Sequence, residues 1–270
     1  MQILFFSDVD GTLAEGDVIA PGVEEAIRDF ITQGNGFSLA TGRHALAIRH
    51  LTKRLGLMLP CIVLAGAALY DPQTEQLTSL KKMPENTLPV LKEMLRRYPE
   101  MGIQVYTEKG LYNLQLNAFL RKNGIPQEIA CGESESAALR GQQILKIGLC
   151  CEDTSQLEEA VGTWFSDERD YHWHYSYRIA LEILSAGVNK GVALHELLRR
   201  LPEQPKLLAA AGDSPSDLPM LKIAACTFAP HNAFESVRMQ VTHEIPTAAE
   251  GGIAEALSIV SKITEMKGRR

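Results

Sequence analysis

Two carboxylates stand one residue apart near the start of the chain, in the stretch ILFFSDVDGTLAEG at residues 3–16. Asp8 and Asp10 follow a short apolar run, and because like charges repel each other, stability alone gives no reason to place them together. Side chains two positions apart on a strand point the same way, so both carboxylates could face one pocket. There they could hold a hard cation such as Mg²⁺, with one carboxyl group working as a general acid.

Two other interpretations compete for the same residues. Asp10-Gly11 is a frequent hairpin turn, but a hairpin needs a second strand directly after the turn, and residues 14–20 have the composition of a loop. A calcium loop of the EF-hand type, counted from Asp8, needs glycine at its sixth place and glutamate at its twelfth, where this chain has Leu13 and Ile19. The calcium loop is therefore excluded, and this segment alone leaves the turn and the magnesium site open.

The elements around the pair predict an α/β fold. Apolar runs alternate with stretches of helical periodicity, which is typical of a parallel sheet covered by helices. The predicted strands lie at residues 3–7, 37–40, 61–65, 207–211 and 226–229. The predicted helices lie near residues 21–34, 47–55, 192–198, 218–224 and 253–266.

Polar residues follow three of these strands: Asp8 and Asp10, then Thr41-Gly42-Arg43, then Gly212-Asp213. Ligands of open α/β sheets bind outside the carboxyl ends of the strands, so these residues should meet. A hydroxyl group and backbone amides at the start of a helix suit a phosphate, and Asp213 adds a metal ligand. Lys190, at another helix start, offers the cation that a phosphoryl group in transfer requires. The combination favours magnesium-assisted phosphoryl transfer over a simple turn.

Residues 82–185 have a different pattern, with predicted helices around 88–95 and 157–165 and strands at 103–107 and 144–150. The segment 171–184, YHWHYSYRIALEIL, alternates between an aromatic and aliphatic face and a face with His172 and His174. Such a pattern predicts a half-exposed antiparallel sheet, and thus an inserted α+β domain with hinges near 81–84 and 185–188. His172 and His174 lack a third ligand, so an exposed strand is favoured over a metal site.

Composition narrows the classes of partner. The chain has 270 residues, a net charge of −6 and scattered basic residues, which argues against nucleic-acid binding. No apolar run approaches the ~20 residues of a membrane span, and the start of the chain lacks the pattern of a signal peptide. Five cysteines without a Cys-x-x-Cys spacing argue against both a disulfide framework and a zinc site. A cytoplasmic protein is expected, and its oligomeric state is open.

The motifs DVDGTL, TGR, GVNKG and GDSPSD, in this order, resemble the four motifs of the haloacid dehalogenase (HAD) superfamily of phosphohydrolases. The insert between the second and third motifs resembles the Cof-type subfamily IIB, which has an α+β cap of type C2B. AGAALYD, HNAFESVR and EGGIAEAL are also similar to that subfamily, so the likeness covers nearly the whole chain. It implies a Rossmann-like catalytic core at residues 1–81 and 186–270 and a cap at residues 82–185.

The resemblance also implies roles for individual residues. Asp8 would be the nucleophile that forms an aspartyl-phosphate, and Asp10 would protonate the leaving oxygen and then activate water. Thr41 and Lys190 would hold the phosphoryl oxygens. Mg²⁺ would bind the Asp8 carboxylate, the backbone carbonyl of Asp10 and Asp213.

Several positions keep two interpretations. Arg43, beside Gly42, is either a substrate contact or a solvated residue of the first helical turn. Asp217 closes the capping box Ser214-Pro215-Ser216-Asp217, or orients Lys190 or the water shell of the metal.

Two residues depart from the family pattern, because Ser216 and Ala65 each stand where asparagine is usual. We expect these departures to slow or retune catalysis and not to abolish it.

The predicted function is Mg²⁺-dependent hydrolysis of a small-molecule phosphate monoester, with sugar phosphates first and nucleotide, flavin or pyridoxal phosphates as further candidates. One alternative is a phosphotransferase or sugar-phosphate mutase that uses the same residues. The other is a non-catalytic ligand-binding regulatory protein that kept the fold. The sequence does not distinguish among the esters.

Overall fold

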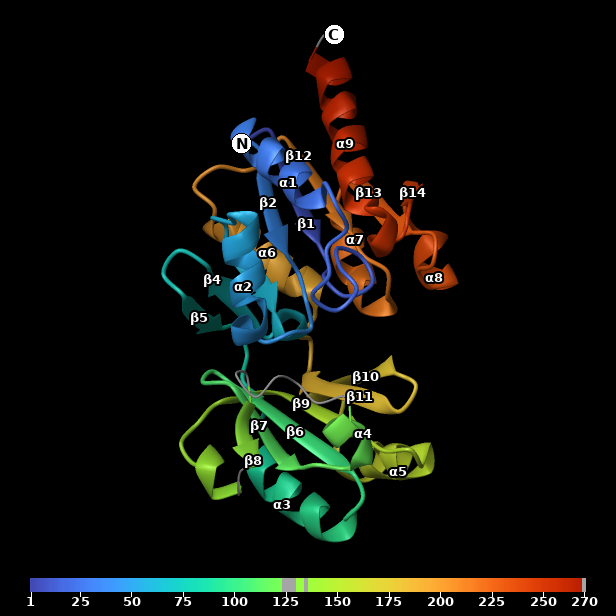
Figure 1. The fold of residues 1–270 in the computed structure, drawn as a ribbon. Helices are drawn as coiled ribbons and strands as arrows, with labels where there is room; N and C mark the ends of the chain where they lie inside the picture. Colours follow the sequence, from blue (N-terminus) through green and yellow to red (C-terminus); the bar gives the residue numbers. More distant parts are fainter. Residues whose placement is uncertain (123–129, 134–135, 269–270) are drawn as a thin grey trace. The chain divides into compact units, whose positions relative to one another are not determined.

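The computed structural model describes residues 1–122, 130–133 and 136–268 (Figure 1). The chain forms two compact units. The first unit contains Met1–Arg43, Ile48–Gln76 and the residues from Asn189 onward, and the second contains His44–Ala47 and Leu77–Val188. Every site residue predicted from the sequence lies in the first unit.

A five-stranded parallel sheet in the order β14-β13-β12-β1-β2 forms the centre of the first unit. The strands are β1 (Ile3–Ser7), β2 (Gly36–Leu39), β12 (Leu207–Ala211), β13 (Cys226–Pro230) and β14 (His243–Ile245). All residues of β1 are buried, which explains its unbroken apolar pattern, since a parallel strand covered on both faces has no solvent side. The predicted strands at 3–7 and 207–211 match β1 and β12.

The helices of the first unit are α1 (Val23–Thr32), α2 (Ala45–Leu55), α6 (Lys190–Arg200), α7 (Leu218–Leu221), α8 (Glu235–Arg238) and α9 (Gly252–Gly268). The residues that α1 buries, Val23, Ile27 and Phe30, recur at helical spacing. Helix α1 packs against α9, which also contacts β1, β12, β13 and β14 (Figure 1). The first three residues of α2, 45–47, belong to the second unit.

The strand predicted at 61–65 is shorter in the structure, and it belongs to a second, smaller sheet of the first unit. β3 (Cys61–Val63) pairs antiparallel with β4 (Ala68–Asp71) in a three-stranded sheet completed by β5 (Gln76–Ser79). It reaches the main sheet through a single parallel bridge between Ala40 and Ile62. The strand ends because Leu64 and Ala65 adopt left-handed backbone angles, with φ of 51° and 53°. That conformation cannot continue a strand.

The second unit is an α+β unit built on a six-stranded sheet in the order β10-β11-β9-β6-β7-β8. Its strands are β6 (Gly102–Thr107), β7 (Leu111–Gln115), β8 (Ala130–Glu133), β9 (Ile144–Cys150), β10 (Tyr171–Tyr177) and β11 (Ala180–Ser185). All pairs are antiparallel except β7 with β8. Its helices are α3 (Thr87–Arg97), α4 (Ala118–Lys122) and α5 (Thr154–Trp164). Leu91 and Met94 of α3 and Leu157 and Val161 of α5 share one apolar core with the sheet.

The alternating segment 171–184 forms a hairpin, so its alternation spans two strands, β10 and β11. Leu181 and Ile183 are buried as expected, whereas Trp173 and Tyr175 are 40% and 42% exposed. These two aromatic residues lie across from Ile183 and Leu181, respectively. β10 is the edge strand of the sheet, so it has a neighbouring strand on one side only. Along β10, this face is therefore buried at Tyr171 and exposed at Trp173 and Tyr175.

Among the helices in the described part of the chain, none is long and apolar enough to span a membrane.

Candidate active site

Three neighbouring strands, β12, β1 and β2, end at the same edge of the parallel sheet. Asp8 directly follows β1 and extends the ladder, because its N–H donates to Ala211 O at 3.0 Å. Thr41 and Asp213 stand two residues beyond the ends of β2 and β12. The sheet therefore brings together residues that are far apart in the chain, as the three strand ends predicted.

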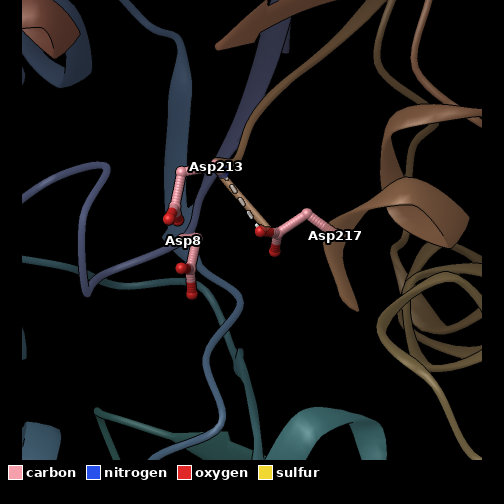
Figure 2. Close-up of side chains that lie close together, drawn as sticks. All are labelled: Asp8, Asp213 and Asp217. Atoms are coloured by element: carbon pink, nitrogen blue, oxygen red, sulfur yellow. Dashed lines mark hydrogen bonds between the residues drawn. The ribbon is translucent and has the colours of Figure 1, made fainter. Parts of the chain in front are cut away.

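A cluster of three carboxylates lies at this edge, with Asp8 and Asp217 buried and Asp213 half-buried. Asp8, Asp213 and Asp217 each place one carboxylate oxygen within 4.8 Å of the others, with Asp217 approaching from a helical segment (Figure 2). The Lys190 Nζ atom donates to Asp8 Oδ1 at 2.7 Å and to Asp217 Oδ1 at 2.6 Å. With all groups ionised, three carboxylates face one ammonium group, which leaves a charge of −2 in a buried place. A divalent cation would balance that charge, so the donor set fits Mg²⁺.

The pKa values of the clustered groups agree with this excess of negative charge. Burial raises the pKa of Asp8 well above its usual value, and the charges of Asp217 and Asp213 add to the effect while Lys190 opposes it. Burial also raises the pKa of Asp213 to about 6, and Asp217 adds to this. Burial lowers the pKa of Lys190, but Asp217 and Asp8 more than offset it, so this pKa lies above its usual value. Lys190 is therefore a permanent cation.

The Asp217 side chain both closes the capping box and binds Lys190. Its Oδ2 atom accepts a hydrogen bond from the backbone N–H of Asp213 at 3.1 Å (Figure 2). The same oxygen accepts the backbone N–H of Ser214 at 3.0 Å, which closes the capping box. Its Oδ1 atom holds Lys190. Because both oxygens have these partners, Asp8 and Asp213 are the better ligands for a metal. The hydroxyl group of Ser216 lies 2.8 Å from that of Ser214 and so joins the cap.

Asp10 lies outside this carboxylate cluster, and its side chain is 55% exposed. Arg43 binds the Asp10 carboxylate in a bidentate way, with Nε donating to Oδ2 at 2.9 Å and Nη2 donating to Oδ1 at 2.7 Å. The same guanidinium group donates to Asp17 Oδ1 at 2.6 Å and to Gly16 O at 2.8 Å. Asp17 was not among the candidates from the sequence, since an acidic residue in a loop carries no signal of its own.

The loop Thr41-Gly42-Arg43 is held by backbone hydrogen bonds from the turn that follows β3. The N–H of Ala65 donates to Thr41 O at 3.0 Å, and the N–H of Leu64 donates to Arg43 O at 2.9 Å. The Thr41 hydroxyl group is buried and accepts the N–H of Arg43 at 3.1 Å, so its own proton can point elsewhere. Ala65 thus supports the loop through its backbone.

Thr12 is a second residue that the sequence reasoning missed. Its buried hydroxyl group donates to Asp213 Oδ1 at 3.0 Å, which orients a candidate metal ligand. Gly11 makes this approach possible, because it has a φ of +81° and a Cβ atom there would lie 2.7 Å from Asp213 Oδ2. The Gly-Thr pair directly after the two aspartates was the signal that could have indicated it.

Close packing at Gly66 positions the lysine. A Cβ atom on Gly66 would collide with the backbone carbonyl of Asn189, the residue before Lys190. Asn189 caps α6, since its side chain accepts the N–H of Val192 at 2.9 Å. Lys190 therefore begins α6 with its backbone fixed on both sides.

Comparison with known proteins identifies the family. The family model for haloacid dehalogenase-like hydrolases matches residues 5–257. The chain belongs to this family. The pyridoxal phosphate phosphatase YbhA of Escherichia coli is 25% identical over 258 residues, which cover 92% of this chain and 94% of that protein.

Solved structures agree on the fold. A haloacid dehalogenase-like hydrolase from Bacteroides thetaiotaomicron has a TM-score of 0.85 and 22% identity, covering 96% of this chain and all of that one (100%). The HAD subclass IIB sugar phosphatase BT4131 has a TM-score of 0.79 and 18% identity, covering 97% and 99% of the two chains. The predicted superfamily, the Cof-type subfamily and the α/β fold are confirmed. The comparisons also support the prediction that the chain is a phosphoric monoester hydrolase.

Proposed function

We propose that this hydrolase removes phosphate from small-molecule phosphate monoesters, with Mg²⁺ as cofactor and an aspartyl-phosphate as intermediate. The observation that carries the proposal is the buried contact between Asp8 and Lys190, which lies beside Asp213 in a cluster where three carboxylates face one ammonium group. In this arrangement Asp8 would be the nucleophile, Lys190 the cation for the phosphoryl group, and Asp8 with Asp213 the ligands of the metal. The division into a core of residues 1–81 and 186–270 and a cap of residues 82–185 is part of this proposal.

In the first step, an oxygen of Asp8 forms a bond to phosphorus while the bond from phosphorus to the ester oxygen breaks. The electron pair of the broken bond stays on the ester oxygen, which takes a proton from Asp10 and leaves as an alcohol. In the second step, water attacks the phosphorus of the aspartyl-phosphate and gives its proton to Asp10. The bond to Asp8 breaks, and inorganic phosphate leaves.

The other residues hold charge and geometry. Lys190 spends two of its three N–H donors on Asp8 and Asp217, and the third can bind a phosphoryl oxygen. The Thr41 hydroxyl group can donate to another phosphoryl oxygen, because it already accepts the N–H of Arg43. Mg²⁺, held by the Asp8 and Asp213 carboxylates and the backbone carbonyl of Asp10, would neutralise charge on the phosphoryl group.

Two classes of ester are the first substrates to test. The similar Escherichia coli protein is a pyridoxal phosphate phosphatase, and the similar solved structure is a sugar phosphatase. Both kinds of substrate are monoesters of alcohols, which are poor leaving groups and need a proton from a general acid. We propose sugar phosphates first and pyridoxal phosphate second.

The proposal is tested by phosphate release from a panel of such esters, with Mg²⁺, with a chelator, and with the variant Asp8→Asn. We expect metal-dependent release that the variant loses, while the matched surface variant Asp29→Asn keeps it. An isomeric phosphate in place of free phosphate would indicate the mutase alternative. Tight binding of an ester without turnover, in a folded and metal-loaded protein, would indicate the regulatory alternative.

A further inference from the structure

The guanidinium group of Arg43 is engaged almost completely by acceptors of the chain itself. Four of its N–H groups donate to the two carboxylate oxygens of Asp10, to Asp17 Oδ1 and to the carbonyl of Gly16. The Arg43 side chain is 19% exposed. Two carboxylates therefore share one positive charge, which leaves a net charge of −1 on this group of three side chains. A site with that charge does not attract a phosphoryl group.

The shape of the contact is as informative as its charge. Two parallel N–H···O bonds from one guanidinium group fix both the position and the plane of a carboxylate, which a lysine cannot do. Asp17 and Gly16 bind the outer side of the same group, at 2.6 Å and 2.8 Å. Arg43 is thus anchored at one end and holds Asp10 at the other. Lys190, by contrast, points into the carboxylate cluster.

We infer that Arg43 is a positioning residue that acts on the reaction through Asp10, and that Asp17 with the Gly16 carbonyl is its anchor. The inference rests on the proposed function, in which the proton of Asp10 moves to the ester oxygen as the phosphorus–oxygen bond breaks and Asp8 bonds to phosphorus. Both Asp10 oxygens accept N–H groups of Arg43, so one must be released before Asp10 carries a transferable proton. The anchor keeps the guanidinium group in place during that release. The Asp10 carboxyl group then rotates while its other oxygen stays bonded to Arg43.

This assignment makes a prediction that a phosphate-binding arginine does not share. Esters of acidic alcohols such as p-nitrophenol leave without a proton, whereas alkyl esters need one. Loss of Arg43 positioning should therefore slow the alkyl ester selectively. Loss of a phosphate contact would slow both esters alike and weaken the binding of inorganic phosphate.

The experiment compares Arg43→Lys and Asp17→Asn with the wild-type protein and with Arg49→Lys, an exposed arginine of α2 that pairs with Glu75. Each protein is assayed with Mg²⁺ on p-nitrophenyl phosphate and on the alkyl phosphate that the wild-type protein hydrolyses fastest. The value of kcat/KM is compared because it reports the steps up to the first phosphoryl transfer, where the leaving groups differ. The inhibition constant of inorganic phosphate is measured for each protein.

For Arg43→Lys we expect kcat/KM on the alkyl ester to fall about 10- to 100-fold, a part of what a general acid contributes. On p-nitrophenyl phosphate it should change by less than about threefold, as should the inhibition constant of phosphate. Asp17→Asn should act in the same direction with a smaller fall, and Arg49→Lys should match the wild-type protein.

An equal fall on both esters, with a higher inhibition constant for phosphate, would assign Arg43 to the phosphoryl group and overturn the inference. Unchanged rates on both esters in Arg43→Lys would overturn it as well. Asp17→Asn keeps the inference testable if Arg43→Lys does not fold. A fall of kcat/KM in Asp17→Asn on the alkyl ester alone supports the inference, and wild-type values on both esters contradict it. A wild-type protein without activity on any ester would refute the proposed function itself, which is a different result.

Discussion

The ammonium group of Lys190 lies 2.7 Å from Oδ1 of Asp8, and both side chains are buried at the carboxyl edge of the parallel sheet. Lys190 is the first residue of α6, and Asp8 directly follows β1, so 182 positions in the sequence separate the partners. The contact places the cation of the site against the proposed nucleophile. It also makes Lys190 the neutralising charge for a cluster of three carboxylates.

Replacing this cation should cost both stability and activity. In Lys190→Met, the carboxylates of Asp8 and Asp217 lose their shared partner, and breaking a buried ion pair costs about 3–5 kcal/mol of unfolding free energy. The measurement is urea denaturation without metal, together with phosphate release. The control Lys53→Met removes an exposed partner of Glu75 and should cost at most about 1 kcal/mol. Equal losses in the two variants would contradict the argument.

Magnesium should stabilise the protein more at neutral than at acidic pH. The pKa of Asp213 is raised to about 6 from an ordinary 3.8, so the folded state binds more protons than the unfolded state between these values. Without metal, this group's contribution to stability is therefore lost as pH rises from about 4 to about 6. A cation replaces the proton on the ionised carboxylate, so its benefit grows over the same range.

Thermal unfolding with and without Mg²⁺, at about pH 5 and about pH 7.5, measures this effect. The increase in Tm should be larger at the higher pH, and Asp213→Asn should show little increase at either. An increase that is the same at both pH values, or larger at pH 5, would be inconsistent with proton competition at Asp213.

Thr12 should tune the affinity for the metal. In Thr12→Val the hydrogen bond to Asp213 Oδ1 is lost at nearly constant volume, and groups that orient a ligand typically change metal affinity by about 10- to 100-fold. We expect weaker Mg²⁺ binding by about tenfold in a calorimetric titration. The control Thr32→Val loses a bond to Asp29 O on the surface of α1 and should bind Mg²⁺ as the wild-type protein does. Unchanged affinity in Thr12→Val would show that this bond does not orient the ligand.

Ala65 carries backbone strain that a glycine would relieve. Its φ of 53° lies in the left-handed region, which costs a residue with a Cβ atom about 1–2 kcal/mol. Glycine avoids this cost but loses more chain entropy on folding, which offsets about 0.5–1 kcal/mol of the gain. Ala65→Gly should thus stabilise the protein by up to about 1 kcal/mol in chemical denaturation. The neighbour Ala67 has a φ of −71°, so Ala67→Gly should destabilise it by a similar amount. Destabilisation in both variants would refute the strain.

The left-handed turn also bears on the asparagine that the family pattern places at position 65. Asparagine tolerates this conformation better than alanine does. The alanine at this position therefore adds strain to the turn, while its backbone N–H still donates to Thr41 O. At Ser216, the other departure, the hydroxyl group bonds within the capping box.

The sequence by itself determined what depends on local pattern. The strands at 3–7, 144–150 and 207–211 agree with the structure because continuous or alternating apolar runs report burial directly. The order of the motifs indicated the family, and the strand ends indicated which edge of the sheet would carry Asp8, Thr41 and Asp213.

Tertiary structure alone decided which of these groups touch. The bond from Thr12 to Asp213 joins residues 201 positions apart, and the fork from Arg43 to Asp10 spans 33 positions, so no periodicity encodes either. The end of β3 and the hairpin at 178–179 likewise depend on backbone turns and on which strand forms the edge of the sheet. A side chain's type and spacing limit what it can bind, but its partner is chosen by the path of the whole chain.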